Sequence, residues 1–564
     1  MTNRSRRLAV IALLGLVALA AVSIGVYRNH ASRVHELVRH VRFDVLHITS
    51  DRAEEDWIVR TEDATRLINY ADGYELDFPA GTELDLSWSS VRVVGTGDGF
   101  RATVTMEYSP YVDPNQEMTD GLSFFAPDFP WEDGVDQYIG YYQSRFLLNR
   151  DWQENNRVDV TAPEVFDAAG HKGYAYHAVI RDVVSGEYDA YSYFFVRCAH
   201  QDFLRVVFAY DSGNTALRDS LPSLFGSFRT FSPSEPGRME TDFRPELPEE
   251  WSDETRALYE RIQNSGELLW GIYTGDIFNT GLHEKVPELE EKLDFRFPII
   301  LAYIHSTMDF PTDFMEENRT SGRVVELTYQ LTENNNTDMR GYSPLLDLYR
   351  GVNEDSVRAF ARAAKEFGHP FLFRLCNEMN SDWTSYGGVN NMADPDVFVT
   401  AWRRIYEIFR EEGVDNCIWI FNPNDRNCPP SRWNDGTNYY PGNEYVQMLG
   451  VTGYNNGTYY EKWAEEWREF DLIYDEIQAQ YLPRFSAFPW IITEFASSSF
   501  GGDKVAWIEN MFDHLSDYPN IKAAVWFSSA DYDGDIPARP YWLDETEDTL
   551  SAFRQGLKKG EKQK

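Results

Sequence analysis

The strongest constraint on the fold is a repeated alternation of short apolar segments and amphipathic segments that begins near Trp251. The apolar segments have the length of strands, and helical periodicity separates most of them, as at 354–367 and 463–481. The predicted strands are 269–274, 298–304, 324–329, 370–376, 417–421, 450–454, 490–493 and 523–527. Because eight such units make a (β/α)8 barrel, we predict a TIM barrel of class α/β over residues 251–560. An open doubly wound sheet is disfavoured, because the segment has no Gly-rich phosphate loop.

A separate block precedes the barrel. Period-two patterns rich in Tyr, Val and Phe predict antiparallel strands at 73–78, 101–107, 172–179, 188–196 and 203–210. Segments 131–148 and 215–225 have helical periodicity, so residues 45–231 are predicted to be an α+β domain with one curved sheet. The turn at 95–99 is predicted to be a hairpin, because no helix follows it. Residues 232–250 contain four prolines and are predicted to be a linker.

The opening "GYELDFPAGTELDL" and the closing "SLFGSFRTF" of this block resemble the PsbP-like fold, a small α+β module. The resemblance covers about 180 residues and implies no catalytic motif. We expect the domain to serve in binding, spacing or docking, with an unknown partner.

The N-terminus carries a membrane-length apolar segment. Residues 8–27 contain no charge and follow Arg4, Arg6 and Arg7. Twenty helical residues span about 30 Å, the thickness of a bilayer core, so residues 1–30 are predicted to be a signal anchor with one transmembrane helix. A cleaved signal peptide is the alternative, because small residues at 18–20 and 21–23 suit a signal peptidase. We therefore expect a single-pass protein of the cell membrane with an extracellular catalytic domain, or a secreted one.

Charge and composition exclude some functions. The chain has 91 Asp and Glu against 52 Lys and Arg, a formal charge of −39, which repels phosphate backbones and argues against nucleic acid as a partner. A neutral polysaccharide is compatible with this charge. The 16 Trp and 33 Tyr can stack on sugar rings, although such residues also fill cores.

No metal or cofactor is expected. The four cysteines, at 198, 376, 417 and 428, show no CxxC pairing, so neither a zinc site nor a disulfide framework is predicted, and pairing of Cys417 with Cys428 stays open. The run Asp531-Tyr-Asp-Gly-Asp535 resembles the start of a calcium loop, but Trp542 stands where that loop needs glutamate. We interpret these acids as residues on the rim of the cleft.

Two glutamates occupy the ends of predicted barrel strands. Glu378 follows the fourth strand and Glu494 ends the seventh. Chemistry in these barrels sits at the C-terminal ends of the strands, and two carboxyl groups are what glycosidic bond cleavage requires. A glutamate at a strand end can also cap the next helix, but two such glutamates favour catalysis.

The segments around both glutamates resemble glycoside hydrolase family 26. The similar motifs are Arg374-x-x-Asn377-Glu378-Met379-Asn380 with Trp383 beyond it, "YYPGNEYV" before "GVTGY", "WIITEF", and Trp526 on the eighth strand. The resemblance covers residues 265–555. It implies a retaining endo-glycosidase that cleaves β-1,4-linked polysaccharide. Family members are mainly β-mannanases, and some act on xylans or mixed-linkage glucans.

The resemblance implies roles for individual residues. Glu378 would be the general acid/base and Glu494 the nucleophile, with Tyr454 and Arg374 holding the nucleophile ionised. Trp526 would form the floor of the subsite for the cleaved sugar, although a Trp on a barrel strand often only packs, and Trp383 would line the neighbouring subsite. One position departs from the family pattern, because Asn377 stands where the family usually has histidine. An asparagine there bonds the sugar 2-hydroxyl in related barrel glycosidases, which weakens the inference of a mannanase.

Two points stay open. His305, after the second strand, either faces the cleft and binds substrate or is a satisfied structural histidine. A catalytically silent carbohydrate-binding barrel at the cell surface is the alternative function. The joint presence of Glu378, Glu494 and Tyr454 argues against it.

Overall fold

The computed structural model describes residues 37, 41–46, 52–86, 92–108, 134–143, 146–184, 188–239, 243–332, 341–463 and 465–562. The chain divides into two compact units, one of residues 1–240 with 431–433, and one of residues 241–430 with 434–564. The boundary at 240–241 falls within the predicted linker. The predicted anchor helix at 8–27 lies outside the described residues. Within the described ranges, no helix is long and apolar enough to cross a membrane.

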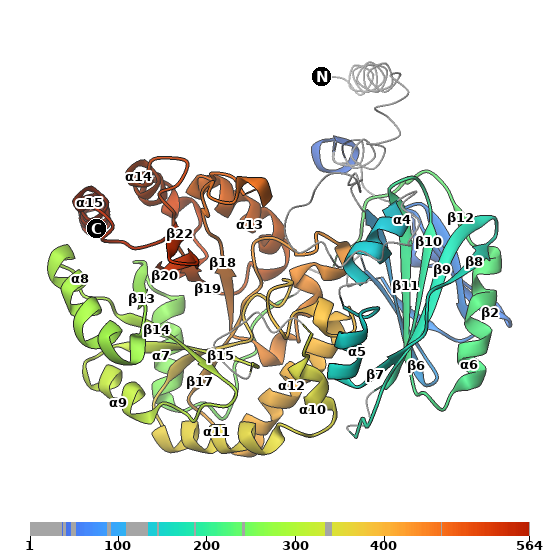
Figure 1. Ribbon diagram of the computed structural model, residues 1–564, viewed down its shortest axis with the longest axis horizontal. Coiled ribbons are helices and arrows are strands. Elements are labelled where there is room, and N and C mark those ends of the chain that lie inside the picture. The colour runs from blue at the N-terminus through green and yellow to red at the C-terminus, as the bar shows by residue number, and fades with distance from the viewer. Residues whose placement is uncertain are drawn as a thin grey trace. The chain divides into compact units, whose positions relative to one another are not determined.

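The first unit contains two antiparallel sheets. The smaller has the order β1-β2-β3-β12, and the larger has the order β4-β5-β6-β11-β10-β9-β7, with β8 also paired to β9 (Figure 1). The strands are β1 (Ile58–Arg60), β2 (Ala64–Asn69), β3 (Tyr74–Pro79), β4 (Glu83–Asp85), β5 (Val93–Gly97), β6 (Phe100–Tyr108), β7 (Val158–Val160), β8 (Glu164–Ala168), β9 (His171–Ile180), β10 (Ala190–Arg197), β11 (Asp202–Tyr210) and β12 (Arg229–Thr230). The described helices include α3 (Glu54–Trp57), α4 (Gly134–Tyr138), α5 (Arg150–Asn156) and α6 (Thr215–Ser220).

The prediction of one curved sheet is therefore wrong, although the five predicted strands are confirmed. The two sheets share one core, to which Leu67 and Phe78 contribute from the smaller sheet and Phe194 and Phe208 from the larger. Alternation along a strand shows that one face is buried, but it does not say which strands pair, and this is why the second sheet was missed. The β5–β6 hairpin is confirmed, with Gly99 in the left-handed conformation at its turn. The resemblance to the PsbP-like fold stays a prediction.

The second unit contains a closed barrel of eight parallel strands, which confirms the predicted (β/α)8 fold. Its strands follow the chain order around the barrel. They are β13 (Leu269–Thr274), β14 (Ile299–His305), β15 (Val324–Gln330), β16 (Phe371–Leu375), β17 (Cys417–Phe421), β18 (Met448–Thr452), β19 (Trp490–Phe495) and β20 (Ile521–Ser528). Each lies within a few residues of its predicted range.

Helices surround the barrel strands (Figure 1). They are α7 (Asp253–Gln263), α8 (Val286–Leu293), α9 (Thr312–Thr320), α10 (Pro344–Tyr349), α11 (Glu354–Phe367), α12 (Pro395–Glu411), α13 (Phe470–Phe485), α14 (Lys504–His514) and α15 (Glu547–Lys562). The predicted helix at 354–367 is confirmed, whereas the helix predicted from 463 begins only at Phe470. A hairpin of β21 (Ala530–Asp533) and β22 (Ile536–Pro540) follows the eighth barrel strand.

Packing closes one end of the barrel. Strand residues such as Leu301, Leu372 and Val525 form the interior, and Trp251, just before α7, and Ile262, near the end of α7, join the same cluster. The Trp251 indole donates a hydrogen bond to the carbonyl of Cys417, the first residue of β17. The N-terminal end of the strands is thereby filled with apolar side chains, which leaves the C-terminal end for chemistry.

The open question about the cysteines is settled against a disulfide. All four cysteines are free thiols. Cys417 is buried at the start of β17, and Cys428 lies in the loop beyond the opposite end of that strand.

Candidate active site

A cleft of about 950 Å³ lies at the C-terminal ends of the barrel strands and contains both glutamates. Of the predicted site residues, Glu378, Glu494, Asn377, Trp383 and Tyr454 line it. Its other walls include Tyr273, Tyr303, Gln330, Asn424, Asp425, Arg468, Phe527, Arg539 and Tyr541. The fourth and seventh strands therefore deliver their carboxyl groups to one cavity.

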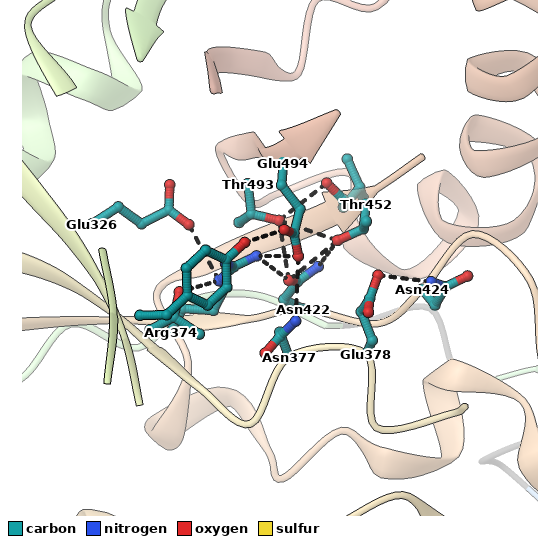
Figure 2. Close-up of polar contacts among 12 residues, drawn as sticks. Glu326, Arg374, Asn377, Glu378, Asn422, Asn424, Thr452, Thr493 and Glu494 are labelled. Atoms are coloured by element: carbon teal, nitrogen blue, oxygen red, sulfur yellow. Dashed lines mark hydrogen bonds and ion pairs between the residues drawn. The ribbon is translucent and has the colours of Figure 1, made fainter. Parts of the chain in front are cut away.

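Glu494 is a buried carboxylate with four hydrogen-bond donors. Its Oε1 accepts from Arg374 Nη1 at 3.0 Å and from Asn377 Nδ2 at 3.2 Å. Its Oε2 accepts from the Tyr454 hydroxyl at 3.2 Å and from the Tyr303 hydroxyl. Its side chain is 7% exposed, and that of Arg374 is fully buried. These four donors fix the orientation of the Glu494 carboxyl group in the cleft (Figure 2).

An irregularity in the sheet brings Glu494 to this position. Successive side chains of a regular strand point to opposite faces. Here two successive side chains reach the same polar cluster, because Thr493 donates a hydrogen bond to Asn422 Oδ1 and Glu494 accepts one from Arg374. The pairing of β19 shifts register against β18 near Thr452 and against β20 between Ile492 and Phe495. Such bulges re-aim side chains, and they are common beside active sites.

Glu378 has a different environment. Its Oε2 accepts from Trp383 Nε1 at 3.0 Å, and its Oε1 accepts from Asn424 Nδ2 at 2.8 Å. Burial of the carboxyl group and the negative charge of Glu494 raise the pKa of Glu378 to about 8, against the two hydrogen bonds and Arg374, which lower it. At neutral pH this carboxyl group therefore carries a proton that it can donate.

The backbone of Glu378 has an unusual conformation. Its φ is 58°, and that of Cys376 is 48°, both in the left-handed region that side chains with a Cβ seldom adopt. The Glu378 N–H donates to the carbonyl of Asn422 at 2.8 Å, and its carbonyl accepts from the N–H of Ser381 at 3.1 Å. These bonds fix the chain just after β16 and hold the carboxyl group over the cleft.

Asn377 contacts the predicted nucleophile directly. Because its Oδ1 accepts from Gln330 Nε2 at 3.0 Å and from the Tyr386 hydroxyl at 3.1 Å, its Nδ2 faces Glu494. The side chain that departs from the family pattern thus donates one hydrogen bond to Glu494. Trp383 likewise binds Glu378 through its indole N–H, besides lining the cleft.

The prediction that Trp526 forms the floor of a subsite is wrong. Its side chain is fully buried, packs against Phe495, Trp507 and Phe553, and donates its indole N–H to the carbonyl of Tyr541. The next residue, Phe527, lines the cleft instead. Side chains alternate along β20, and Val525 belongs to the barrel interior, so 525 and 527 face inward while 526 faces the helices.

His305 and the acidic hairpin also have clear positions. His305 Nδ1 lies 2.7 Å from the Thr307 hydroxyl, burial lowers the pKa of its ring, and it is not part of the cleft wall. The interpretation of the acids as rim residues holds for Asp531, which lines the cleft and accepts from Arg539 Nη1 at 2.8 Å. No cluster of His, Cys, Asp and Glu suited to a metal ion occurs among the described residues.

Sequence reasoning missed several site residues. Tyr303 is two positions after Leu301, so strand alternation pointed it inward. Asn424 sits in the polar "NPND" loop after β17, which was a visible signal. Glu326 is a lone carboxyl group inside the apolar strand "VVELTYQ", and a buried ionisable group of that kind is itself a sign of function.

Comparison with known proteins agrees with the resemblance inferred from the motifs. Residues 349–479 match glycosyl hydrolase family 26. This stretch contains Glu378 and Tyr454 but ends before Glu494. The similarity to this family therefore covers the segment around Glu378.

Among curated relatives, endoglucanase H of Acetivibrio thermocellus is 28% identical over 273 residues, which are 46% of this chain and 28% of that protein. Mannan endo-1,4-beta-mannosidase A and B of Caldalkalibacillus mannanilyticus is 28% identical over 131 residues, 22% of this chain and 23% of that protein. The chain thus spans about a quarter of the length of these relatives. A solved β-mannanase from Bacteroides ovatus is 12% identical, with 55% of this chain and 94% of that one covered and a TM-score of 0.43.

Proposed function

We propose that this chain is a retaining endo-glycoside hydrolase that cleaves a β-1,4-linked polysaccharide, with a mannan-type polymer as the first candidate. Glu494 would attack the anomeric carbon and form a glycosyl ester while Glu378 protonates the leaving oxygen. Glu378 would then deprotonate the incoming water, which attacks the ester and releases the sugar with retained configuration.

The observation that carries this proposal is the contrast between two carboxyl groups in one cleft. Glu494 accepts four hydrogen bonds, one from a buried guanidinium, whereas burial and a like charge raise the pKa of Glu378 to about 8. Two carboxyl groups in such different environments, one surrounded by donors and one with a raised pKa, can divide the roles of nucleophile and acid. A silent binding barrel would have no use for this arrangement.

Two relatives suggest different sugars. The mannosidase from C. mannanilyticus favours a mannan, whereas the endoglucanase from A. thermocellus matches a larger share of this chain and favours a β-glucan. Asn377 bears on the same choice, because its amide lies beside the carboxylate that reacts next to the sugar 2-hydroxyl. Mannose carries that hydroxyl axially and glucose equatorially. A mixed-linkage glucan is therefore the second candidate, and xylan is the third.

A hydrolysis screen on soluble mannan, xylan and mixed-linkage glucan, with the products sized, tests the reaction and the substrate together. We expect internal cleavage of one polymer, with oligosaccharides of several lengths appearing early. Absence of cleavage of all three polymers, together with measurable binding to one, would support the silent barrel instead.

Substitutions separate the two glutamates. Glu494→Ala is expected to lose almost all turnover, a loss of several kcal/mol of transition-state stabilisation. Glu378→Ala is expected to keep glycosylation by an aryl glycoside with a good leaving group and then to stall at hydrolysis. Added azide, which needs no deprotonation, should rescue it and give a glycosyl azide of retained configuration. An inverted azide from Glu378→Ala would mean that the roles are exchanged.

We propose further that residues 8–27 anchor the protein in the membrane with the barrel outside the cytoplasm. The support is the uncharged run of membrane length in the sequence. The protein should fractionate with membranes, and a chain starting at residue 45 should not. A mature N-terminus near residues 21–24 would instead identify a cleaved signal peptide.

A further inference from the structure

A third carboxyl group lies behind the two that line the cleft. Glu326, in the middle of β15, is fully buried, and its Oε1 lies 3.3 Å from Nε of Arg374. Neither of its carboxyl oxygens accepts a hydrogen bond from any residue that the structure describes. Arg374 lies between Glu326 and Glu494, with its Nε near Glu326 and its Nη1 donating to Glu494 Oε1 at 3.0 Å (Figure 2).

The charges of this cluster do not balance if every carboxyl group is ionised. Glu326, Glu378 and Glu494 would then carry three negative charges against the single positive charge of Arg374. The nearby Tyr303 and Tyr454 stay neutral, because burial raises the pKa of both phenols well above its ordinary value. An uncompensated charge is costly away from water, so only one of the three carboxyl groups is expected to be an anion.

Hydrogen bonding decides which group carries that charge. Glu494 accepts four hydrogen bonds and Glu378 accepts two, whereas Glu326 accepts none from the described residues. Donors stabilise the ionised form of a carboxyl group, so the negative charge belongs on Glu494 and the two protons on the other pair.

We propose that Glu326 is a positioning residue that stays protonated, packs as a neutral group against Nε of Arg374, and so leaves the charge of Arg374 undivided for the nucleophile. This inference rests on the proposed function for the role of Glu494. An ionised Glu326 would compete with Glu494 for the guanidinium of Arg374 and weaken the support that Arg374 gives to the nucleophile. Burial is the main cause that raises the pKa of Glu326, to about 8. The positive charge of Arg374 opposes this rise, and the negative charge of Glu494 adds to it.

Infrared spectroscopy tests the protonation state without requiring any activity. At pH 6.5, carboxyl groups on the surface are ionised, so absorption by protonated carboxylic acids reports groups with a raised pKa. We expect Glu326→Gln and Glu378→Gln each to remove a separate part of that absorption. The matched control is Thr328→Val, because the Thr328 hydroxyl accepts from Arg374 Nε at 2.7 Å and carries no charge. An unchanged spectrum in Glu326→Gln, or the same loss in Thr328→Val, would overturn the proposal.

Kinetics test the consequence for the nucleophile. Glu326→Leu replaces the polar group beside Nε of Arg374 by an apolar one, and we expect about a tenfold loss of kcat with little change in KM. Glu326→Gln replaces a neutral acid by a neutral amide. Its kcat should therefore lie within about threefold of the unmodified protein's, and the acidic limb of the pH profile of kcat/KM should stay in place. A Gln variant as damaged as the Leu variant would refute the neutral form. So would an acidic limb displaced to lower pH by about one unit, because that shift marks the removal of a competing anion.

The two proposals fail separately. If the protein cleaves no polysaccharide, the proposed function is lost, while the infrared measurement still decides whether Glu326 holds a proton. If the Glu326→Leu variant does not fold, the Glu326→Gln variant and the infrared spectrum of the unmodified protein remain decisive.

Discussion

Asn424→Ala should extend the proposed glycosidase activity to higher pH. The Asn424 amide donates to Glu378 Oε1 at 2.8 Å, and this bond favours the ionised carboxylate. A hydrogen bond to a charged group is worth about 1.5–3 kcal/mol, and one to the neutral form about 0.5–1.5 kcal/mol. The difference is about 1–1.5 kcal/mol, or about one pKa unit.

The sign follows from the role of Glu378. In the proposed mechanism Glu378 must be protonated to assist the leaving group, so activity is expected below its pKa and is lost as pH rises through it. Burial and Glu494 already raise the pKa of Glu378 to about 8. Loss of the Asn424 amide removes a contribution that lowers it, and the alkaline limb should move up to about pH 9.

The assay is kcat/KM on the polysaccharide that the screen identifies, measured from about pH 5 to about pH 10 so that both limbs are covered. Trp383→Phe removes the other donor, at 3.0 Å from Oε2, and should move the limb in the same direction. The control is Asn427→Ala in the same loop, because the Asn427 Oδ1 accepts from Asn380 and does not touch Glu378. An alkaline limb that stays in place or moves down in both Asn424→Ala and Trp383→Phe would refute the reasoning.

Three further predictions concern other parts of the chain. Tyr454→Phe removes a 3.2 Å hydrogen bond to Glu494 and should lower kcat about two- to tenfold with KM unchanged; a rise in KM alone would show that Tyr454 binds substrate only. Trp526→Ala should lower the free energy of unfolding by about 3–5 kcal/mol in thermal melts, whereas Phe527→Ala should mainly raise KM, and the reverse pattern would contradict the burial of Trp526. Limited proteolysis should cut first within 232–250, and sequencing of the fragments would show a first cut elsewhere.

Local sequence patterns determined much of the fold. Each barrel strand is a short apolar segment between helical segments. The length of the apolar segments and the helical periodicity between them were therefore enough to place all eight strands near their observed bounds. The first unit shows where this reasoning stops. Its strands were recognised by alternation, but their division into two sheets depends on pairing between residues far apart in the chain, which alternation does not encode.

For the site, the sequence by itself determined that Glu378 and Glu494 stand at the ends of two strands, because each closes an apolar segment in a recognisable motif. The alternation of side chains along the eighth strand was also readable from the sequence. It places Phe527, and not Trp526, on the side of the cleft. Only the tertiary structure decided the surroundings of the two carboxyl groups. The bulge that turns Glu494 inward, the two donors on Glu378, and Glu326 behind Arg374 all come from different strands and loops. Burial and hydrogen bonds set the charge of a carboxyl group, and these arise only when the barrel closes and brings those segments together.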